Sequence, residues 1–298
     1  MRLAYGCMGL ADVARAEAAV VAAYESGIRL FDHADIYGGG VAESVFGEVL
    51  ARHPGLREEI AIQTKCGIVL GGAEGGNAYD LSREHLLRSV DGSLERLGVD
   101  HVDRLLLHRP DPLAHPDEIA AAFDTLSAAG KVASFGVSNM DAAQIAHLHA
   151  VVRQPLDANQ VELGLGHRDL IEAGVLVNHP DGRTYAAAPG LLEFCTDHDI
   201  AVQAYGALAQ GRFTGRPRSP EDEAAGLLVT RYAAELGTTP EAVVLGWLLK
   251  HPAQIVAVIG TTDPARIRAC ADSEEVAEAM TRTQWWSLWT AARGVSVP

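Results

Sequence analysis

Cysteine is scarce in this sequence of 298 residues, and its copies have no spacing typical of a metal site or a redox pair. The four cysteines are Cys7, Cys66, Cys195 and Cys270. So few thiols, so far apart, are typical of a reduced compartment, and we expect a cytoplasmic protein. The sequence also lacks an HExxH motif and any matching set of ligands, so we predict no metal site.

Long apolar runs and positive charge are also scarce. No run approaches the roughly 20 residues that a membrane-spanning helix needs. The start, MRLAYGCMGLADVARAE, lacks the charged and then apolar order of a secretory signal. Lys and Arg number 24 against 39 Asp and Glu, which gives a net charge of −15. Nucleic acids and anionic membranes require a basic face, so we expect neither as a partner.

Short apolar runs and amphipathic helical patterns alternate along the chain. Eight runs begin near residues 3, 28, 60, 102, 132, 156, 201 and 255, and each precedes a helical pattern. This alternation predicts βαβ units, and eight of them favour a (β/α)8 TIM barrel of the α/β class over an open sheet. No GxGxxG follows the first run, which argues further against an open dinucleotide-binding sheet. We expect one domain over residues 1–298.

Several helix ends can be read from single residues. Asp12 is predicted to cap the first helix, Gly27 to end it, and Ser82 to cap the helix after the third run. The segment 67–81 reads as a mobile Gly-rich loop, and 163–189 reads as an irregular stretch that leads into a helix.

Two helical patterns, at 239–250 and 281–293, read as additions to the barrel. The last one carries three tryptophans, at positions 285, 286 and 289. We interpret them as packing this C-terminal helix on the barrel, with stacking on a ligand as the alternative.

Polar residues follow the apolar runs at the ends where barrel enzymes keep their chemistry. These residues are Asp32, Tyr37, Lys65, His108, Ser138, Asn139, Asn159, Gln160 and Tyr205. Each alone is compatible with a structural role, but together they meet at one mouth of the predicted barrel.

The first four of these residues have a joint chemical logic. A phenol with a pKa near 10 is a poor acid at pH 7, and a nearby ammonium lowers that pKa. A carboxylate such as Asp32 holds Lys65 charged and oriented, and His108 can orient a carbonyl beside Tyr37. Carbonyl reduction needs such an acid together with a hydride from a cofactor.

Six segments in chain order carry a resemblance to a known family. They are FDHADIYGGG (31–40), IQTKCG around Lys65, LLLHRPDP (105–112), GVSN (136–139), ANQVE (158–162) and VIGTTDPARI (258–267). The sequence resembles the aldo-keto reductase superfamily, in particular its bacterial NADP(H)-dependent aldehyde and ketone reductases. The resemblance implies reduction of an aldehyde or ketone to an alcohol, with Tyr37 as general acid, Lys65 as its activator, Asp32 as the partner of Lys65 and His108 as the residue that orients the substrate.

The resemblance also implies a set of cofactor-binding residues. Ser138, Asn139 and Gln160 would bind the nicotinamide carboxamide, and Tyr205 would stack on the ring. Backbone N–H groups around the loop after the seventh strand would wrap the pyrophosphate, and the segment from Gly260 to Arg266 would hold the adenosine end. The full set is Gly6, Cys7, Met8, Ser138, Asn139, Gln160, Tyr205, Gly206, Ala207, Leu208, Gly211, Arg212, Ile259, Gly260, Thr261, Thr262 and Arg266.

Three features depart from the family pattern. His33 stands where many members have Thr or Ser, and we interpret it as packing below the site. The chain starts almost at its first predicted strand, so the usual N-terminal hairpin is lacking or the start is truncated. Gly260 stands where many NADP-preferring members carry Lys or Arg, so we expect NADP(H) to be preferred only modestly and NAD(H) to be usable.

Two other functions remain open at this stage. One is a Schiff-base aldolase that uses Lys65 as a nucleophile, which leaves the GVSN and ANQVE segments without a purpose. The other is a non-catalytic nicotinamide-binding regulatory subunit, which would not need all four polar residues. The sequence does not specify the carbonyl substrate, and we expect a monomer or a weak homo-oligomer.

Overall fold

The computed structural model describes residues 1–71, 75–184 and 189–298 and contains a closed barrel of eight parallel strands. Their order around the barrel is β1-β10-β9-β8-β7-β6-β3-β2. The strands are β1 (Leu3–Gly6), β2 (Leu30–Asp32), β3 (Ala61–Cys66), β6 (Val102–Leu107), β7 (Val132–Ser138), β8 (Leu156–Glu162), β9 (Ala201–Tyr205) and β10 (Val256–Ile259). The predicted (β/α)8 barrel is confirmed, and the eight apolar runs are its strands.

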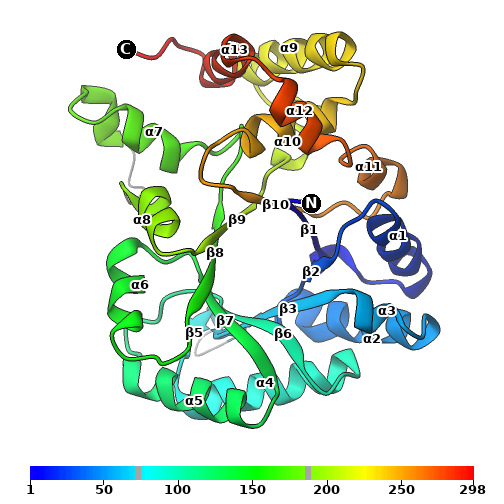
Figure 1. Cartoon of the computed structure of the whole chain (residues 1–298), viewed down its shortest axis with the longest axis vertical. Coiled ribbons are helices and arrows are strands. Elements are labelled where there is room, and N and C mark those ends of the chain that lie inside the picture. Colours follow the sequence, from blue (N-terminus) through cyan, green and yellow to red (C-terminus); the bar gives the residue numbers. More distant parts are fainter. Residues whose placement is uncertain (72–74, 185–188) are drawn as a thin grey trace. The chain divides into compact units, whose positions relative to one another are not determined.

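The chain divides into two compact units. The N-terminal unit comprises Ala4–Gln160 and Gly260–Pro264, and the C-terminal unit comprises Met1–Leu3, Val161–Ile259 and Ala265–Pro298. In the N-terminal unit, helices lie around the strands (Figure 1). They are α1 (Val13–Glu25), α2 (Val41–Arg52), α3 (Leu56–Glu59), α4 (Arg83–Leu97), α5 (Pro116–Ala128) and α6 (Ala142–His149), with short 3-10 turns η1 (Cys7–Gly9) and η2 (Tyr37–Gly40).

Capping side chains begin the helices where the sequence predicted them. The Asp12 carboxylate accepts a hydrogen bond from the Arg15 N–H, and the Ser82 hydroxyl accepts one from the His85 N–H. Gly27 has φ of 87°, and its position directly after the C-cap of α1 ends that helix as predicted. The end of α1 leads into β2, and the start of α4 follows the loop after β3.

Strand register brings the polar residues of the N-terminal unit into rows. Asp32 on β2 pairs with Gln63 on β3, and Gln63 pairs with Arg104 on β6. Residues in register on neighbouring strands point to the same side of the sheet, and alternate residues share a face. Lys65 therefore lies on the same face as Gln63, two positions nearer the carboxyl end of β3.

The C-terminal unit holds the remaining helices around a hydrophobic layer. They are α7 (Asp169–Val175), α8 (Leu191–Asp197), α9 (Pro220–Leu236), α10 (Pro240–Leu249), α11 (Pro264–Arg268), α12 (Ser273–Ala279) and α13 (Arg282–Arg293), with 3-10 turns η4 (Pro180–Thr184) and η5 (Ala209–Gly211). Figure 1 shows α13 beside α9. Every residue of α10 from Ala242 to Leu249 is buried, so this helix forms the centre of the layer.

The tryptophans of α13 pack within this layer. The rings of Trp285 and Trp247 stack at 5.0 Å, and each indole N–H donates to the backbone carbonyl of the other residue. Trp289 is fully buried at the edge of Trp247. The Trp286 ring lies 4.9 and 5.1 Å from the rings of Trp285 and Trp289, and it also lines a shallow surface hollow of about 630 Å³ together with Leu228 of α9. All three tryptophans thus take part in packing.

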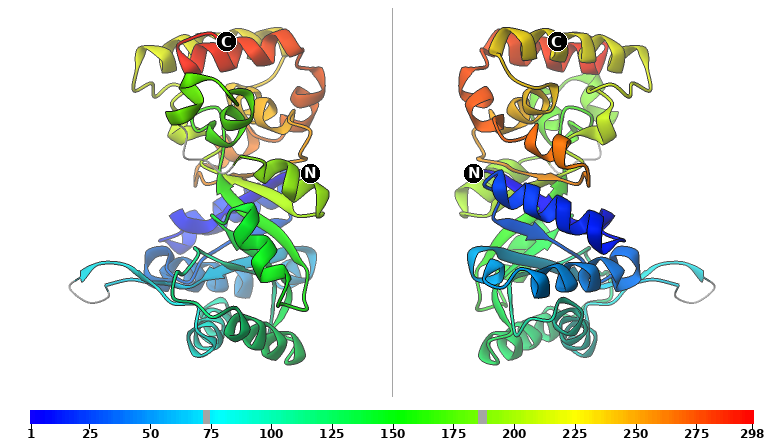
Figure 2. Two further views of the ribbon diagram at one scale, coloured as in Figure 1. Left: turned by 90° about the vertical axis from the view of Figure 1, so that its left-hand side faces the viewer. Right: turned by 90° about the vertical axis from the view of Figure 1, so that its right-hand side faces the viewer.

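Several elements differ from the sequence-based expectations. The predicted loop at 67–81 contains an antiparallel hairpin of β4 (Ile68–Val69) and β5 (Ala78–Tyr79), which extends outward from the helices of its unit (Figure 2). We expected this loop to be mobile, and its residues 72–74 lie outside the described residues. The short helices α3, α7 and α12 were also not predicted. None of the helices within 1–71, 75–184 and 189–298 has the length and apolar character needed to span a bilayer.

Candidate active site

A buried ion pair forms the centre of the polar cluster in the N-terminal unit. The Lys65 ammonium lies 2.6 Å from Asp32 Oδ1, and the two side chains are 1% and 2% exposed. The ammonium also donates to the backbone carbonyl of His33 at 2.8 Å. Adjacent parallel strands bring the pair together, because both residues lie at the carboxyl ends of β2 and β3. In this setting the ammonium has one fixed position.

Tyr37 lies on the turn that follows β2. Gly38 and Gly39 after it have φ of 60° and 66°, a left-handed backbone that favours glycine, so the GGG sequence makes the tight turn into α2 possible. The Lys65 ammonium is 5.1 Å from the centre of the Tyr37 ring, and its charge opposes the rise in the pKa of the phenol. The His108 ring packs against Tyr37 edge to face at 6.2 Å. The four residues predicted from the sequence thus lie together.

The electrostatics keep both protons of this cluster in place near neutral pH. Burial alone would lower the pKa of Lys65, but Asp32 and Tyr37 outweigh it and raise the pKa. Burial raises the pKa of Tyr37, and Lys65 opposes that rise. We expected the ammonium to bring this pKa down. The Lys65 charge does lower the pKa, but burial of the phenol raises it by more, so Tyr37 is protonated near neutral pH and can act as a donor.

His108 is a neutral imidazole in this environment. Burial lowers its pKa to about 3, and the positive charges of Lys65 and Arg109 act in the same direction. Its Nδ1 has no hydrogen-bond partner among the residues the structure describes. A neutral ring can donate from one nitrogen and accept at the other, so it can hold a substrate oxygen without adding charge.

His33 packs beneath the site, as interpreted from the sequence. Its ring is fully buried and lies 4.5 Å from the Phe46 ring, and burial lowers its pKa to about 3. Neither ring nitrogen has a hydrogen-bond partner within the described chain. Its backbone contacts the neighbouring strand: the carbonyl accepts from Lys65, and the N–H donates to the Gln63 carbonyl.

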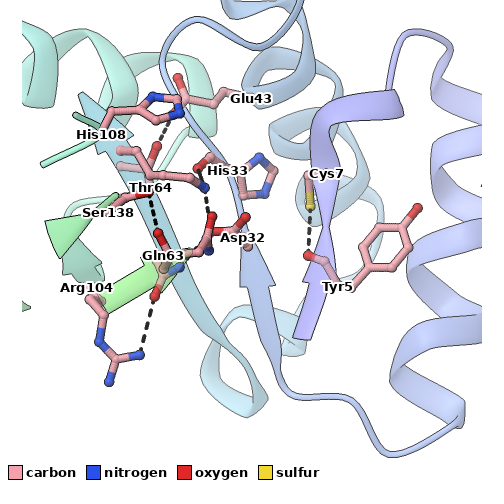
Figure 3. A network of polar contacts seen from close by, with 12 residues as sticks. Tyr5, Cys7, Asp32, His33, Glu43, Gln63, Thr64, Arg104, His108 and Ser138 are labelled. Carbon is pink, nitrogen blue, oxygen red and sulfur yellow. Dashed lines mark hydrogen bonds and ion pairs between the residues drawn. The ribbon is translucent and has the colours of Figure 1, made fainter. Parts of the chain in front are cut away.

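Further polar side chains support the cluster, and sequence reasoning missed them (Figure 3). Gln63 Nε2 donates to Asp32 Oδ1 at 2.6 Å. The fully buried Glu43 of α2 accepts from the Thr64 hydroxyl at 2.6 Å and from Arg96 Nε at 2.8 Å. Strand alternation could have identified Gln63 as a neighbour of Lys65. No sequence pattern connects Glu43 to residues on β3 and α4.

The residues expected to bind the nicotinamide carboxamide lie at the carboxyl ends of β7 and β8. The Ser138 hydroxyl donates to the Gln160 carbonyl at 2.8 Å, and Asn139 Nδ2 donates to Ser138 Oγ at 2.8 Å. Asn139 has φ of 57°, a conformation that strains a non-glycine residue. Gln160 Nε2 donates to Asp32 Oδ1 at 3.0 Å, so this amide also belongs to the support of the ion pair.

The turn after β1 and the segment after β10 are neighbours within the N-terminal unit. Gly6 ends β1, Cys7 is buried, and Met8 is 68% exposed. A Cβ on Gly9 would lie 3.2 Å from Thr262, and the Arg15 guanidinium lies 3.4 Å from the Thr262 hydroxyl. Arg15 is a second cation near this segment that sequence reasoning missed. The rest of the segment is Ile259, Gly260 and Thr261, with the Thr261 hydroxyl accepting from the Asp263 N–H.

In the C-terminal unit, the loop after β9 has an unusual backbone. Gly206 and Gly211 have φ of 69° and 85°, and Ala209 and Gln210 between them have φ of 47° and 55°. Non-glycine residues in this region are strained and cluster at binding sites, where left-handed residues aim N–H groups at anions. The expected residues Gly206, Ala207, Leu208 and Gly211 belong to this loop, and the expected Tyr205 is the last residue of β9 before it.

Two arginines beside this loop already have acidic partners. Arg212 donates two hydrogen bonds to the fully buried Asp222, at 2.8 and 2.6 Å. Arg266 contacts Glu241 at 3.2 Å and the Thr214 hydroxyl at 3.1 Å. Arg266 also lies 3.5 Å from the position that a Cβ on Gly211 would take. Both guanidinium groups are about 30% exposed, so each retains a face toward solvent.

Comparison with known proteins identifies the family. The sequence profile of the Aldo/keto reductase family matches residues 2–285. A 6-dehydroglucose reductase of Agrobacterium fabrum is 36% identical over 99% of this chain and 95% of its own. The oxidoreductase YdhF of Escherichia coli is 38% identical over 91% of this chain and 85% of its own. The chain therefore belongs to the aldo/keto reductase family of oxidoreductases.

A solved structure supports the fold independently. The glycerol dehydrogenase AKR11B4 of Gluconobacter oxydans matches with a TM-score of 0.77, over 93% of this chain and 89% of its own, at 24% identity. That likeness concerns the fold alone. Members of the family bind nicotinamide cofactors, usually NADP(H). In the described part of the chain, no cluster of His, Cys, Asp and Glu could hold a metal ion.

Proposed function

We propose that this protein reduces an aldehyde or ketone to an alcohol with NADPH, and that Tyr37 is the general acid. The observation that carries the proposal is the buried contact of Asp32, Lys65 and Tyr37 in one unit, with a protonated phenol beside a neutral His108. A protonated phenol beside an ammonium can donate its proton to the alkoxide that develops when a carbonyl is reduced.

Each side chain has a distinct part in the proposed reaction. The neutral His108 ring orients the carbonyl oxygen toward the Tyr37 phenol, and the phenol gives its proton to that oxygen. Lys65 stabilises the phenolate left behind, and Asp32 keeps the ammonium in place. When bound, the nicotinamide cofactor supplies the hydride, which no side chain can supply.

The residues present include groups of the kinds that such a cofactor needs. In the N-terminal unit, Ser138 and Asn139 offer hydroxyl and amide groups for the carboxamide. In the C-terminal unit, the strained loop at 206–211 has the backbone of an anion-binding turn, with Arg266 beside it. Because Glu241 already offsets much of the charge on Arg266, we expect a modest preference for NADPH, with NADH usable.

A titration followed by an assay tests the proposal. Quenching of the tryptophan fluorescence gives the Kd of NADPH and NADH, and a panel of carbonyl compounds then identifies substrates by cofactor oxidation. The name of the Agrobacterium relative makes 6-dehydroglucose the first sugar carbonyl to include. Binding of NADPH with turnover of any carbonyl supports the proposal. Binding without turnover of any compound favours a regulatory subunit instead, and borohydride trapping of a substrate on Lys65 favours an aldolase.

A further inference from the structure

A chain of polar contacts, buried at Asp32 and Gln63 and partly exposed at Arg104 and Asp157, leads away from the ion pair along the barrel strands. Gln63 Nε2 donates to Asp32 Oδ1 at 2.6 Å, and Arg104 donates from one terminal guanidinium nitrogen to Gln63 Oε1 at 3.4 Å (Figure 3). Arg104 in turn forms two hydrogen bonds with the Asp157 carboxylate, at 2.7 and 2.8 Å. Gln63 is fully buried. The contacts follow from strand register, which aligns Asp32, Gln63 and Arg104.

The groups at its two ends fix the orientation of the Gln63 amide. An arginine can only donate hydrogen bonds, so Gln63 Oε1 has to face Arg104. A carboxylate that binds an ammonium accepts them, so Gln63 Nε2 has to face Asp32. Exchanging the two ends of the amide would place a donor against the Arg104 donor and an acceptor against the Asp32 acceptor. Arg104 itself is fixed by the two bonds to Asp157.

Three donors share one oxygen of Asp32. Lys65 Nζ, Gln63 Nε2 and Gln160 Nε2 approach Oδ1 at 2.6, 2.6 and 3.0 Å. The ammonium brings positive charge, and the two amides set the plane of the carboxylate and spread its negative charge. Without Gln63, the carboxylate would keep its charge and lose one of the contacts that direct it toward Lys65.

We propose that Gln63 is a positioning residue for the reaction: its amide, oriented by Arg104, fixes the Asp32 carboxylate and thereby the placement of Lys65 against Tyr37. This inference rests on the proposed function. Gln63 touches neither the phenol nor a substrate, so it acts through Asp32 and Lys65. The Arg104–Asp157 pair serves as its anchor.

The first test replaces Gln63 with a side chain of similar size that cannot donate. Gln63→Leu is expected to lower kcat about 10-fold, the low end for a hydrogen bond to a charged group, because Asp32 keeps two donors. KM and the cofactor Kd are expected to stay within about twofold. The matched control is Gln154→Leu, which removes a similar bond of 2.9 Å to Asp124 far from the site and should leave kcat unchanged.

The second readout follows Tyr37 without cofactor or substrate. The groups that face its phenol are Asp32, Lys65, Cys7 and His108. Losing a neutral donor leaves more of the Asp32 charge uncompensated, which disfavours the phenolate. Gln63→Leu should therefore move the alkaline titration of the phenol to higher pH, by about half a unit. The signal is the tyrosinate absorbance of each protein minus that of its Tyr37→Phe counterpart.

The anchor is tested by removing both of its charges together. Arg104→Met with Asp157→Leu leaves no unpaired charge. In that background, Gln63→Leu should lower kcat by a smaller factor than it does in the wild type, because the amide has already lost its orientation. Unchanged kcat in Gln63→Leu overturns the proposal. So does a kcat loss without a shift in the Tyr37 titration, which would indicate a merely structural role. If the wild type reduces no carbonyl while Gln63→Leu still shifts the Tyr37 titration, the proposed function is refuted and the positioning of Lys65 by Gln63 stands.

Discussion

The ion pair of the candidate active site differs in exposure from the two pairs beside the loop at 206–211. In the N-terminal unit, Asp32 and Lys65 are both closed to solvent, at 2% and 1% exposure. In the C-terminal unit, Arg212 and Arg266 are 30% and 28% exposed, while their partners Asp222 and Glu241 are at most 13% exposed. The first pair buries both charges, whereas the other two bury mainly the acid.

This contrast indicates two kinds of site. A pair sealed from water fixes an ammonium in one place, at the cost of desolvating both charges, and is sensitive to the loss of either partner. A pair whose arginine is about 30% exposed leaves part of the guanidinium open to an anion from solvent. The first arrangement suits proton transfer, and the second suits recognition of a phosphate.

The largest effect is expected where the sealed pair is broken. Lys65→Met should lower kcat by about 10²–10⁴-fold, because the phenolate loses the cation that stabilises it. It also leaves the Asp32 charge buried without its ion partner, so the melting temperature should fall.

A second substitution separates these two effects. Adding Asp32→Asn to Lys65→Met removes the remaining charge, so stability should recover while kcat stays low. Calorimetry and single-turnover kinetics measure the two quantities. Recovery of both together would mean that Lys65 acts only through stability.

His108→Ala tests whether the neutral imidazole orients the substrate. Ketones should lose about 10²-fold in kcat/KM, and aldehydes less, because a less reactive carbonyl depends more on alignment. His85→Ala on α4, a histidine of the same unit that does not touch the cluster, is the control. Equal losses for aldehydes and ketones would assign His108 a structural role.

The half-exposed pair is tested by Arg266→Ala. The Kd of NADPH should rise about 10-fold and that of NADH should not change, because the 2′-phosphate alone distinguishes the two. Arg231→Ala removes an Arg–Glu pair elsewhere in the C-terminal unit and serves as control. Tighter binding of NADH than NADPH by the wild type would refute the preference, and equal weakening of both by Arg266→Ala would refute its basis.

The last effect concerns folding stability and a carboxylate that lacks a cationic partner such as Lys65. Burial, and then the charge of Glu43, raise the pKa of Asp35 to about 7. The unfolded chain ionises this group near pH 4 and the folded protein near pH 7, so stability falls as pH rises between those values and stays low above. Asp35→Asn should therefore raise the free energy of unfolding by about 1–3 kcal/mol at pH 8 and by almost nothing at pH 4. Urea titrations at both pH values measure it, and an equal effect at both would contradict the assignment.

Local signals decided which parts of the fold could be predicted. Each strand contains a short apolar run, and α1 and α4 begin at capping side chains that the sequence displays. Helices α7 and α12 have only seven residues each and no side-chain cap, so they leave no such mark. They form because tertiary packing stabilises them, as the contact of α12 with α10 illustrates.

The residues of the candidate site could also be predicted only in part. Asp32, Lys65 and His108 lie at or just after the carboxyl ends of β2, β3 and β6, so their convergence could be predicted from barrel topology. The pairing of Arg212 with Asp222 and of Arg266 with Glu241 could not, because any of several acids was a possible partner. Nor could the pKa of Tyr37, because its direction depends on burial that no sequence pattern reports.

The most direct test of the proton-donor assignment is Tyr37→Phe, measured as single-turnover reduction together with the cofactor Kd. The phenol gives the proton and is not expected to hold the cofactor, so the rate should fall by about 10²–10⁴-fold while the Kd of NADPH stays unchanged. A variant that keeps more than about a tenth of the wild-type rate would contradict the role of Tyr37 as general acid.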